Sequence, residues 1–520
     1  MMSIKMKSIF ADIGAFASIL LVLIPISLET VANQVGANPH PLSFFIGPAL
    51  YSYGAGLIPN VDYFSQYGTG VGALFSYFLN NSPMEVFKAS ILITVSGTVF
   101  FALTFYLLAK WVLDSRVWAF FLTLIALILN FSSVAPFTSP SLWPIRYPFL
   151  ALFCLLFIVF CKTPVISLKK IIFILLGLVA GISLFWSTEI GISIILPGAF
   201  CIWFNTRSPM RAVLAVLMFF AVTGLAFIGL SVFAFGTGVL HINFIMGIFK
   251  PAIMYGSGFG AFPVNWLSPA EFLFNVLIPV VLVTTVIWGI SSKPLVHEKQ
   301  PVLLLIAFIA LMQLTKFWNM SLATVWLSNS YLPLLIFMFW LRTAINNSHM
   351  LFIRNGLSLM VLSVGIIYIF SFNDPRMPSI FGVKSYQKYP SVLMGLHKNS
   401  FKIPPTTMNF SVAEVAHQDV MLIQKWVLPG ERAYIYSSRD WVYLLRAQRA
   451  PGFPFIPSTM TPLKEQGEKP LSAAKIIFFE KGEQLWGNNV EMATSIQQRL
   501  RAEFVLVATG IHLDVYQQHR

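Results

Sequence analysis

Long apolar runs separated by short polar segments dominate the first 372 residues of the chain. A helix needs about 20 apolar residues to cross the roughly 30 Å hydrocarbon core of a bilayer. Runs that meet this length, or shorter runs in pairs, occupy residues 10–28, 87–109, 115–131, 147–161, 171–186, 190–204, 211–235, 270–290, 301–315, 329–341 and 355–372. The pattern predicts a polytopic α-helical membrane protein with about eleven spans. The first run follows Lys5 and Lys7 as in a signal peptide, but its length and Asp12 within it favour a retained anchor.

Lysine and arginine gather at alternate turns between these runs. Positive residues are retained on the cytoplasmic side of a membrane, and most of them fall on one side when the N-terminus is cytoplasmic. With eleven spans, this topology places the first long loop, residues 29–86, and the chain after residue 372 outside the cytoplasm. The sequence therefore predicts a multi-pass protein of the plasma (inner) membrane whose chemistry takes place on the extracytoplasmic or periplasmic face.

The last part of the chain, residues 373–520, has charges throughout and forms a second domain after the membrane domain of residues 1–372. Strand patterns occur at 433–436, 475–479, 504–508 and 511–516, and helix patterns at 411–427, 440–448 and 489–502. Their alternation predicts a small α/β domain with a mainly parallel sheet. The last strand is expected to pair with its neighbour across the turn at Thr509-Gly510. No Gly-rich nucleotide-binding turn follows the first strand.

Composition excludes several classes of protein. The chain is 57% hydrophobic and only 10% charged, with a mean hydropathy of +0.76, which no ordinary globular protein shows. Its net charge of +14 is explained largely by basic turns beside anionic lipid headgroups, so nucleic acid is not implied. Cys154, Cys161 and Cys201 all lie in predicted spans, so we expect neither a disulfide in the outer domain nor a cysteine metal site. The absence of a phosphate-binding Gly-Lys-Ser/Thr loop argues against an ATP-driven machine.

The most informative segment is residues 56–70, which read GLIPNVDYFSQYGTG and follow the first predicted span. This segment places one carboxylate, Asp62, among aromatic side chains. A carboxylate within hydrogen-bond reach can take the proton of a sugar hydroxyl as that hydroxyl becomes a nucleophile. The competing interpretation is structural, because Asn60, Val61 and Asp62 follow Pro59 as the residues of a turn do.

The chain resembles the GT-C superfamily of integral-membrane glycosyltransferases, and within it the branch of protein mannosyltransferases and aminoarabinose transferases. The resemblance rests on one span, an outer loop reading G-x-I-P-x-V-D-Y-F-x-Q-Y-G, many further spans and a small outer α/β domain. It implies transfer of a sugar from a polyprenyl-phosphate donor to an extracytoplasmic acceptor, which is an envelope glycan, lipopolysaccharide or protein. It also implies that Asp62 is the catalytic base.

Many members of this family carry a second acidic residue in or near the same loop, whereas Val61 stands beside Asp62 here. Whether Glu29, Glu85 or Glu189 supplies a second carboxylate stays open. Because an Asp-x-Asp pair is missing, a divalent metal is not indicated, and we predict no cofactor.

Three basic residues in outer segments are candidates to bind the donor phosphate: Arg146, Lys250 and Lys316. Each could equally extend its charge to lipid headgroups from an interfacial position. Four residues are candidates for substrate contacts: Gln66, Tyr67, Glu189 and His241. Each of the last three has a competing interpretation. Tyr67 could be an interfacial anchor, and His241 an ordinary polar residue. Glu189 could be an acidic residue in the first turn of a helix that Ser187 or Thr188 caps.

Proteins of other classes share parts of this pattern. A glycan polymerase or ligase acting on lipid-linked oligosaccharide would use the same compartment, but such enzymes usually lack a terminal α/β domain of this size. A lipid or sugar transporter should show internal repeats and charged or broken helices at the bilayer midplane. Here the acidic residues before position 373 fall in predicted loops or near the ends of spans. A non-catalytic assembly protein would leave residues 56–70 unexplained.

Overall fold

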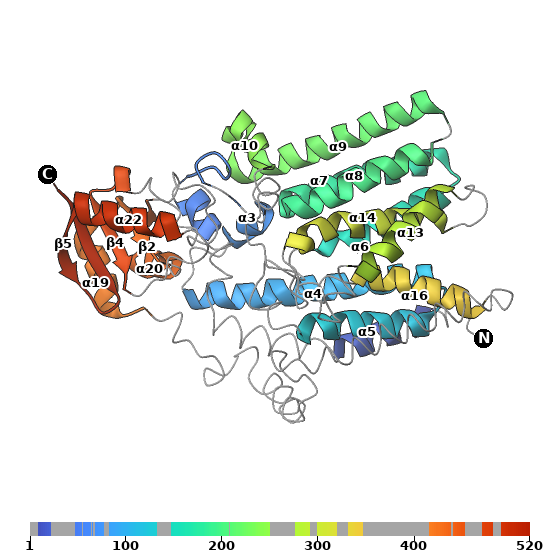
Figure 1. Cartoon of the computed structure of the whole chain (residues 1–520), viewed down its shortest axis with the longest axis horizontal. Coiled ribbons are helices and arrows are strands. Elements are labelled where there is room, and N and C mark those ends of the chain that lie inside the picture. The colour runs from blue at the N-terminus through green and yellow to red at the C-terminus, as the bar shows by residue number, and fades with distance from the viewer. Residues whose placement is uncertain are drawn as a thin grey trace.

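The protein consists of a bundle of long helices with a small domain of strands and helices at one end (Figure 1). The computed structural model describes residues 9–21, 47–54, 56–63, 65, 68–76, 83–132, 147–206, 208–249, 276–291, 299–319, 331–346, 415–437, 440–452, 471–481 and 490–519.

The bundle is built from helices that coincide with the predicted apolar runs. They are the N-terminal helix Ile9–Leu21, α4 (Pro83–Leu113), α5 (Arg116–Ser132), α6 (Pro148–Lys162), α7 (Ile166–Trp186), α8 (Thr188–Phe204), α9 (Pro209–Phe235), α13 (Ile278–Ser291), α14 (Gln300–Asn319) and α16 (Tyr331–Asn346). Every run predicted before residue 355 corresponds to one of these helices, at least in part. The run at 355–372 lies outside the described residues.

Three of these helices are long and apolar enough to cross a membrane: Val95–Leu113 within α4, Ile166–Trp186 and Pro209–Phe235. Only 17% of the most apolar window of α9 is buried inside the protein. The outer face of α9 carries large apolar side chains, among them Leu217, Leu225 and Phe233. Such a surface is compatible with lipid and not with water. These are the features of a helical membrane protein.

Helices α7 and α9 pack closely because α7 carries two small residues one turn apart. A Cβ atom at Gly177 would lie 2.6 Å from Val222 Cγ1, and one at Gly181 would lie 2.5 Å from the carbonyl oxygen of Thr223. Side chains at these two positions would push the helices apart. The spacing of the two glycines is that of the Gly-x-x-x-Gly motif, which permits close contact between helices in membranes.

Several short elements lie at the end of the bundle that carries the small domain (Figure 1). They are the π-helix η1 (Leu50–Gly54), α3 (Gly70–Ser76), the 3₁₀ helix η2 (Thr237–Leu240) and α10 (Ile242–Gly247). Two of them, η1 and α3, belong to the predicted first outer loop. The predicted catalytic loop and the C-terminal domain therefore occupy the same end of the molecule.

The C-terminal domain contains three described helices and six strands. They are α19 (His417–Trp426), β1 (Arg432–Ala433), β2 (Ile435–Tyr436), α20 (Asp440–Ala447), β3 (Ala450–Pro451), β4 (Ile476–Glu480), α22 (Val490–Glu503), β5 (Phe504–Thr509) and β6 (Leu513–Gln518). Strands β1 and β3 form a parallel pair, and the other four form a sheet in the order β2-β4-β6-β5.

The prediction of a mainly parallel sheet is wrong for this four-stranded sheet. Only β2 and β4 run parallel, while β4 with β6 and β5 with β6 are antiparallel. The predicted pairing of the last two strands across Thr509-Gly510 is confirmed. That hairpin explains the difference, because β6 folds back between β4 and β5 and separates two strands that α22 would otherwise join in parallel.

A buried carboxylate holds the hairpin against α19. Asp419 of α19 is fully buried and accepts hydrogen bonds from the amides of His512 and Leu513, at 3.0 Å and 3.3 Å. Amide donors of this kind offset the cost of burying a charged carboxylate. A Cβ atom at Gly510 would lie 2.0 Å from Asp419 Oδ1, so the turn residue must be glycine for the two segments to meet.

Candidate functional site

Asp62 lies in a tight turn formed by residues 58–63. Its amide donates to the carbonyl of Ile58 at 2.9 Å, and its Oδ2 atom accepts from the Ile58 amide at 2.8 Å. The amide of Asn60 donates to the carbonyl of Tyr63 at 2.5 Å and closes the same turn. The carboxylate of Asp62 is half-buried. A carboxylate accepts several hydrogen bonds, so one bond to a backbone amide orients the group without exhausting it.

The conformation of this loop explains three of its residue types. Gly56 has a φ of 65°, Asn60 a φ of 62° and Gly68 a φ of 96°. Backbone in this region is unfavourable for most residues, but glycine adopts it readily and asparagine tolerates it. The two outer glycines of the sequence motif therefore have a backbone role.

Tyr63, which follows Asp62, is a structural residue. Its side chain is buried, and its hydroxyl donates to the carbonyl of Pro48 at 3.1 Å and lies 2.7 Å from Ser52 Oγ. Its ring meets the ring of Tyr51 edge-on, with 5.6 Å between the centroids. Tyr63 thus joins the Asp62 turn to the π-helix η1.

The loop also packs on the corner between α7 and α8. The amide of Thr69 donates to the carbonyl of Phe185 at 3.1 Å. A Cβ atom at Gly68 would lie 2.6 Å from the carbonyl oxygen of Trp186 and 2.7 Å from Ser187 Cα. Backbone therefore touches backbone here, immediately before the first turn of α8, which carries Glu189.

On another side, the Asp62 turn packs against η2 and α10. The side chains of Ile58 and Val61 contact an apolar cluster that includes Val239 and Phe244. A Cβ atom at Gly247 of α10 would lie 2.4 Å from Asn60 Cβ. The loop that contains the turn is therefore held by η1, which shortly precedes it in the chain, and by two distant segments, the α7–α8 corner and α10.

Three of the sequence-predicted site residues belong to these joined segments. Asp62 lies in the turn, Glu189 is half-buried in the first turn of α8, and His241 is exposed at the start of α10. The predicted N-cap position before Glu189 is occupied by Ser187, although its side chain makes no capping hydrogen bond. His241 has a local structural role, since its Nδ1 accepts from the amide of Asn243 at 3.2 Å.

The other five candidates fall, wholly or in their side chains, outside the described residues. Arg146, Lys250, Gln66 and Tyr67 lie outside the described residues. Lys316 lies on α14, and its side chain is also outside the described part of the structure. Their predicted roles in binding the donor phosphate and the substrate remain predictions.

The sequence gives little indication of a contact between the loop and the C-terminal domain. The hydroxyl of Tyr51 in η1 donates a short hydrogen bond to Asp440 Oδ2 at the start of α20, and both side chains are buried. Helix α20 also contacts α4, and β3 contacts η1. A hydrogen bond between residues so far apart in the chain has no local signal. The only available indication was the acidic residue at the beginning of a predicted helix.

We expect Tyr51→Phe to loosen this contact without unfolding the bundle. The change removes one donor from the buried Asp440 carboxylate, which should cost about 1–3 kcal/mol. Hydrogen–deuterium exchange should become faster in residues 50–54 and 440–447. Tyr434→Phe is the matched control. Tyr434 lies between β1 and β2 of the C-terminal domain, and its change should leave exchange in both segments unchanged. Equal protection of η1 and α20 in wild type and Tyr51→Phe would show that the hydrogen bond does not hold the domain to the loop.

The described site offers an oriented carboxylate beside a helix corner and a domain interface. Among the described residues, no group of three or more histidine, cysteine or acidic side chains is placed to hold a metal ion. An oriented carboxylate of this kind can accept a proton from a neighbouring hydroxyl group.

No protein-family model matches the chain, and no curated protein matches it.

Proposed function

We propose that the protein is an integral-membrane glycosyltransferase of the GT-C type that transfers a sugar from a polyprenyl-phosphate donor to an extracytoplasmic acceptor. The observation that carries the proposal is the placement of Asp62. Its carboxylate is oriented by the Ile58 amide in a loop held by η1, the α7–α8 corner and α10. A structural turn alone does not require this convergence of segments, whereas a catalytic carboxylate must be held within a fraction of an ångström of its working position.

In the proposed reaction, the oxygen of an acceptor hydroxyl bonds to the anomeric carbon of the donor sugar while its proton passes to Asp62. The bond between the anomeric carbon and the phosphate oxygen breaks, and polyprenyl phosphate leaves with the electron pair. A single displacement inverts the configuration at the anomeric carbon, and one carboxylate is sufficient for it. Cations at the membrane boundary would receive the charge of the leaving phosphate, and Arg146, Lys250 and Lys316 are the sequence candidates.

The proposal includes a topology. About eleven spans with a cytoplasmic N-terminus put the Asp62 loop and the C-terminal domain in the extracytoplasmic space of the plasma membrane. The placement of η1, α3 and the C-terminal domain at one end of the bundle supports this arrangement, because a single membrane face must hold all of them. The acceptor in this proposal is an envelope glycan, lipopolysaccharide or protein.

The test is transfer from a panel of radiolabelled polyprenyl-phosphate sugars in membranes that contain the protein. We expect label to leave one donor and appear in an extracytoplasmic acceptor, with no release in matched membranes that lack the protein. Mass spectrometry of the product identifies the sugar, and NMR of the new linkage checks for inversion. Folded protein that turns over no donor, with acceptors supplied, would favour a ligase or a transporter instead.

A further inference from the structure

The C-terminal domain reaches the predicted catalytic loop through a buried hydrogen bond. The Tyr51 hydroxyl of η1 donates to Asp440 Oδ2 at the start of α20, and the two residues are 1% and 2% exposed. The domain also meets this end of the bundle through contacts of β3 with η1 and of α20 with α4. A hydrogen bond to a carboxylate that is shielded from water is stronger than a bond between neutral groups at a surface. The bond is therefore placed to fix η1 relative to the domain.

Asp440 is itself fixed within the C-terminal domain. Its Oδ1 atom accepts from the amide of Trp441 at 2.7 Å, and its own amide donates to the carbonyl of Ser437 at 3.3 Å. The hydroxyl of Ser437 donates to the carboxylate of Glu480, the last residue of β4. Ser437, Asp440 and Glu480 are all buried. The acceptor of the Tyr51 hydroxyl is thus tied to the segment that follows β2 and to the end of β4.

On its other side, η1 holds both ends of the Asp62 turn. The carbonyl of Tyr51 accepts from the amide of Leu57, which precedes the turn, at 3.0 Å. The ring of Tyr51 meets the ring of Tyr63, which ends the turn, with 5.6 Å between the centroids. Ser52 Oγ lies 2.7 Å from the Tyr63 hydroxyl. One short element therefore connects the residues before and after Asp62 with the C-terminal domain.

The element η1 depends on such contacts for its conformation. It is a π-helix of five residues, Leu50–Gly54. π-Helices are rare and short, and helical segments of this length are not stable on their own in water. Leu50 and Tyr51 are buried, so tertiary packing supplies the stability that the segment lacks by itself. Loss of the bond to Asp440 should therefore affect η1 and the turn attached to it.

We infer that Tyr51 is a positioning residue for Asp62, through which the C-terminal domain holds the Asp62 carboxylate in its working position. This inference rests on the proposed sugar transfer, because it gives the domain a part in the same reaction. Tyr51 acts through η1 and the turn, and its role requires no contact with the sugar. A displacement of about 1 Å in a positioning segment reduces a rate by about 100-fold, so a fraction of that shift should lower kcat about fivefold. KM for the donor should not change.

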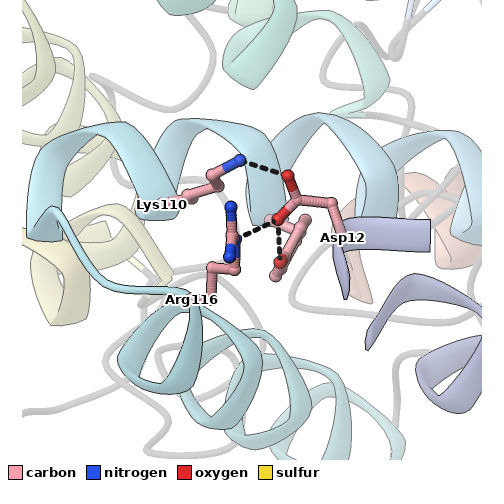
Figure 2. Close-up of polar contacts among 4 residues, drawn as sticks. Asp12, Lys110 and Arg116 are labelled. Carbon is pink, nitrogen blue, oxygen red and sulfur yellow. Dashed lines mark hydrogen bonds and ion pairs between the residues drawn. The ribbon is translucent and has the colours of Figure 1, made fainter. Parts of the chain in front are cut away.

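Tyr106 provides a matched control, because its hydroxyl also donates to a carboxylate from a distant segment. The acceptor is Asp12 of the N-terminal helix, at 3.1 Å, and Tyr106 is fully buried. Figure 2 shows Lys110 and Arg116 directed at the same carboxylate, with Lys110 Nζ at 2.5 Å and Arg116 Nε at 2.9 Å. Tyr106→Phe therefore removes the same chemical group from a carboxylate that keeps two cations. It should leave the Asp62 turn unchanged.

The first measurement is hydrogen–deuterium exchange of the purified full chain in detergent, which does not depend on transfer. In Tyr51→Phe, we expect the amides of residues 57–63 to exchange about tenfold faster, as for the loss of one hydrogen bond to a charged acceptor. Tyr106→Phe should keep the wild-type rate. Asp440→Ala breaks the same bond from the domain side. Adding Tyr51→Phe to Asp440→Ala should change nothing further, because the partner of the hydroxyl is already gone.

Three results of the exchange measurement would overturn the inference. They are wild-type protection of the turn in Tyr51→Phe, an equal loss of protection in Tyr106→Phe, and a further loss in the double variant. The Asp440→Ala variant tests the same bond if Tyr51→Phe does not fold, because it should also speed exchange in residues 57–63.

The second measurement is the kinetics of transfer from the active polyprenyl-phosphate donor. Tyr51→Phe should lower kcat about fivefold at unchanged KM, and Tyr106→Phe should match the wild type. Adding Tyr51→Phe to Asp62→Asn should cause no further loss of the residual rate, because Tyr51 acts through Asp62. A further loss, or an unchanged kcat in Tyr51→Phe, would contradict a positioning role. Wild-type protein that transfers no sugar would contradict the proposed function instead, and exchange in residues 57–63 would still decide whether the domain holds the turn.

Discussion

Asp62→Asn is expected to remove sugar transfer and leave the fold intact. Proton abstraction by a positioned base contributes roughly 10²- to 10⁴-fold to a reaction rate, and asparagine cannot take a proton at neutral pH. The turn should survive, because the amide oxygen of asparagine can accept the hydrogen bond that Asp62 Oδ2 accepts from Ile58. Initial rates of transfer from the active polyprenyl-phosphate donor are the measurement, with thermal unfolding in detergent as the check on folding.

A second variant separates the catalytic role from the structural one. Asp62→Ala removes both the proton acceptor and the acceptor for the Ile58 amide. If Asp62 only shapes the turn, the asparagine variant should keep the transfer activity and the thermal stability that the alanine variant loses. If Asp62 is the base, both variants should lose transfer, and only alanine should also lower the unfolding temperature. Full transfer by Asp62→Asn would exclude Asp62 as the base, whatever the result for alanine.

The helical part of the fold could be predicted because its signal is local. Each apolar run is long, and a bilayer demands that its backbone groups be satisfied within the segment, so a long apolar run has one stable form. The ends of the helices depend on individual residues. Helix α4 begins at Pro83, before the predicted start at residue 87. Proline is common in the first turn of a helix, because its ring restricts φ to a helical value and it lacks the amide that a first-turn residue leaves unpaired.

The strand order of the C-terminal domain could not be obtained in the same way. Strands and helices alternate between β2 and β5, which is the pattern of a parallel sheet. The final hairpin makes the sheet mostly antiparallel instead, because β6 pairs antiparallel with both β4 and β5. Pattern and propensity give the strands and their faces, but insertion of one strand between two others depends on contacts distant in the sequence. Here, burial of Asp419 beneath the Gly510 turn is one such contact.

In the candidate site, too, local features could be predicted from the sequence and contacts between distant segments could not. The motif at 56–70 makes Asp62 the candidate base, which stays a prediction, and the turn expected after Pro59 under the structural interpretation is present. The supporting partners Phe185, Trp186 and Gly247 come from helices more than a hundred residues away, so no spacing in the sequence indicates them. Asp12 had a local signal, because it interrupts an apolar run. Its partners Lys110 and Arg116 appeared in the sequence only as basic residues of a turn.

Gly68→Ala is expected to damage the same site through its backbone. An alanine there must adopt a φ of 96°, and its Cβ would lie 2.6 Å from the carbonyl oxygen of Trp186. The conformation costs about 1–2 kcal/mol for an L-residue, and crowding in a packed region adds about 1–3 kcal/mol. The loop can relieve the clash only by moving away from the α7–α8 corner. A displacement of about 1 Å in a positioning segment can reduce a rate by about 100-fold, so transfer should fall more than tenfold.

Gly56→Ala is the control that isolates the close approach. Gly56 also has a positive φ, 65°, but no atom of the described residues lies within 4 Å of the position its Cβ would take. The Gly56→Ala variant should lose about 1 kcal/mol of folding free energy, from the unfavourable backbone conformation alone, and retain most of its transfer activity. Thermal unfolding and initial transfer rates of both variants are the measurements. Equal losses would mean that backbone strain alone explains the effect and that the contact with α7–α8 is dispensable. A larger loss for Gly68→Ala in both measurements would instead show that contact with the α7–α8 corner holds the Asp62 loop in position. Glu189, in the first turn of α8, would then lie next to a segment that activity requires.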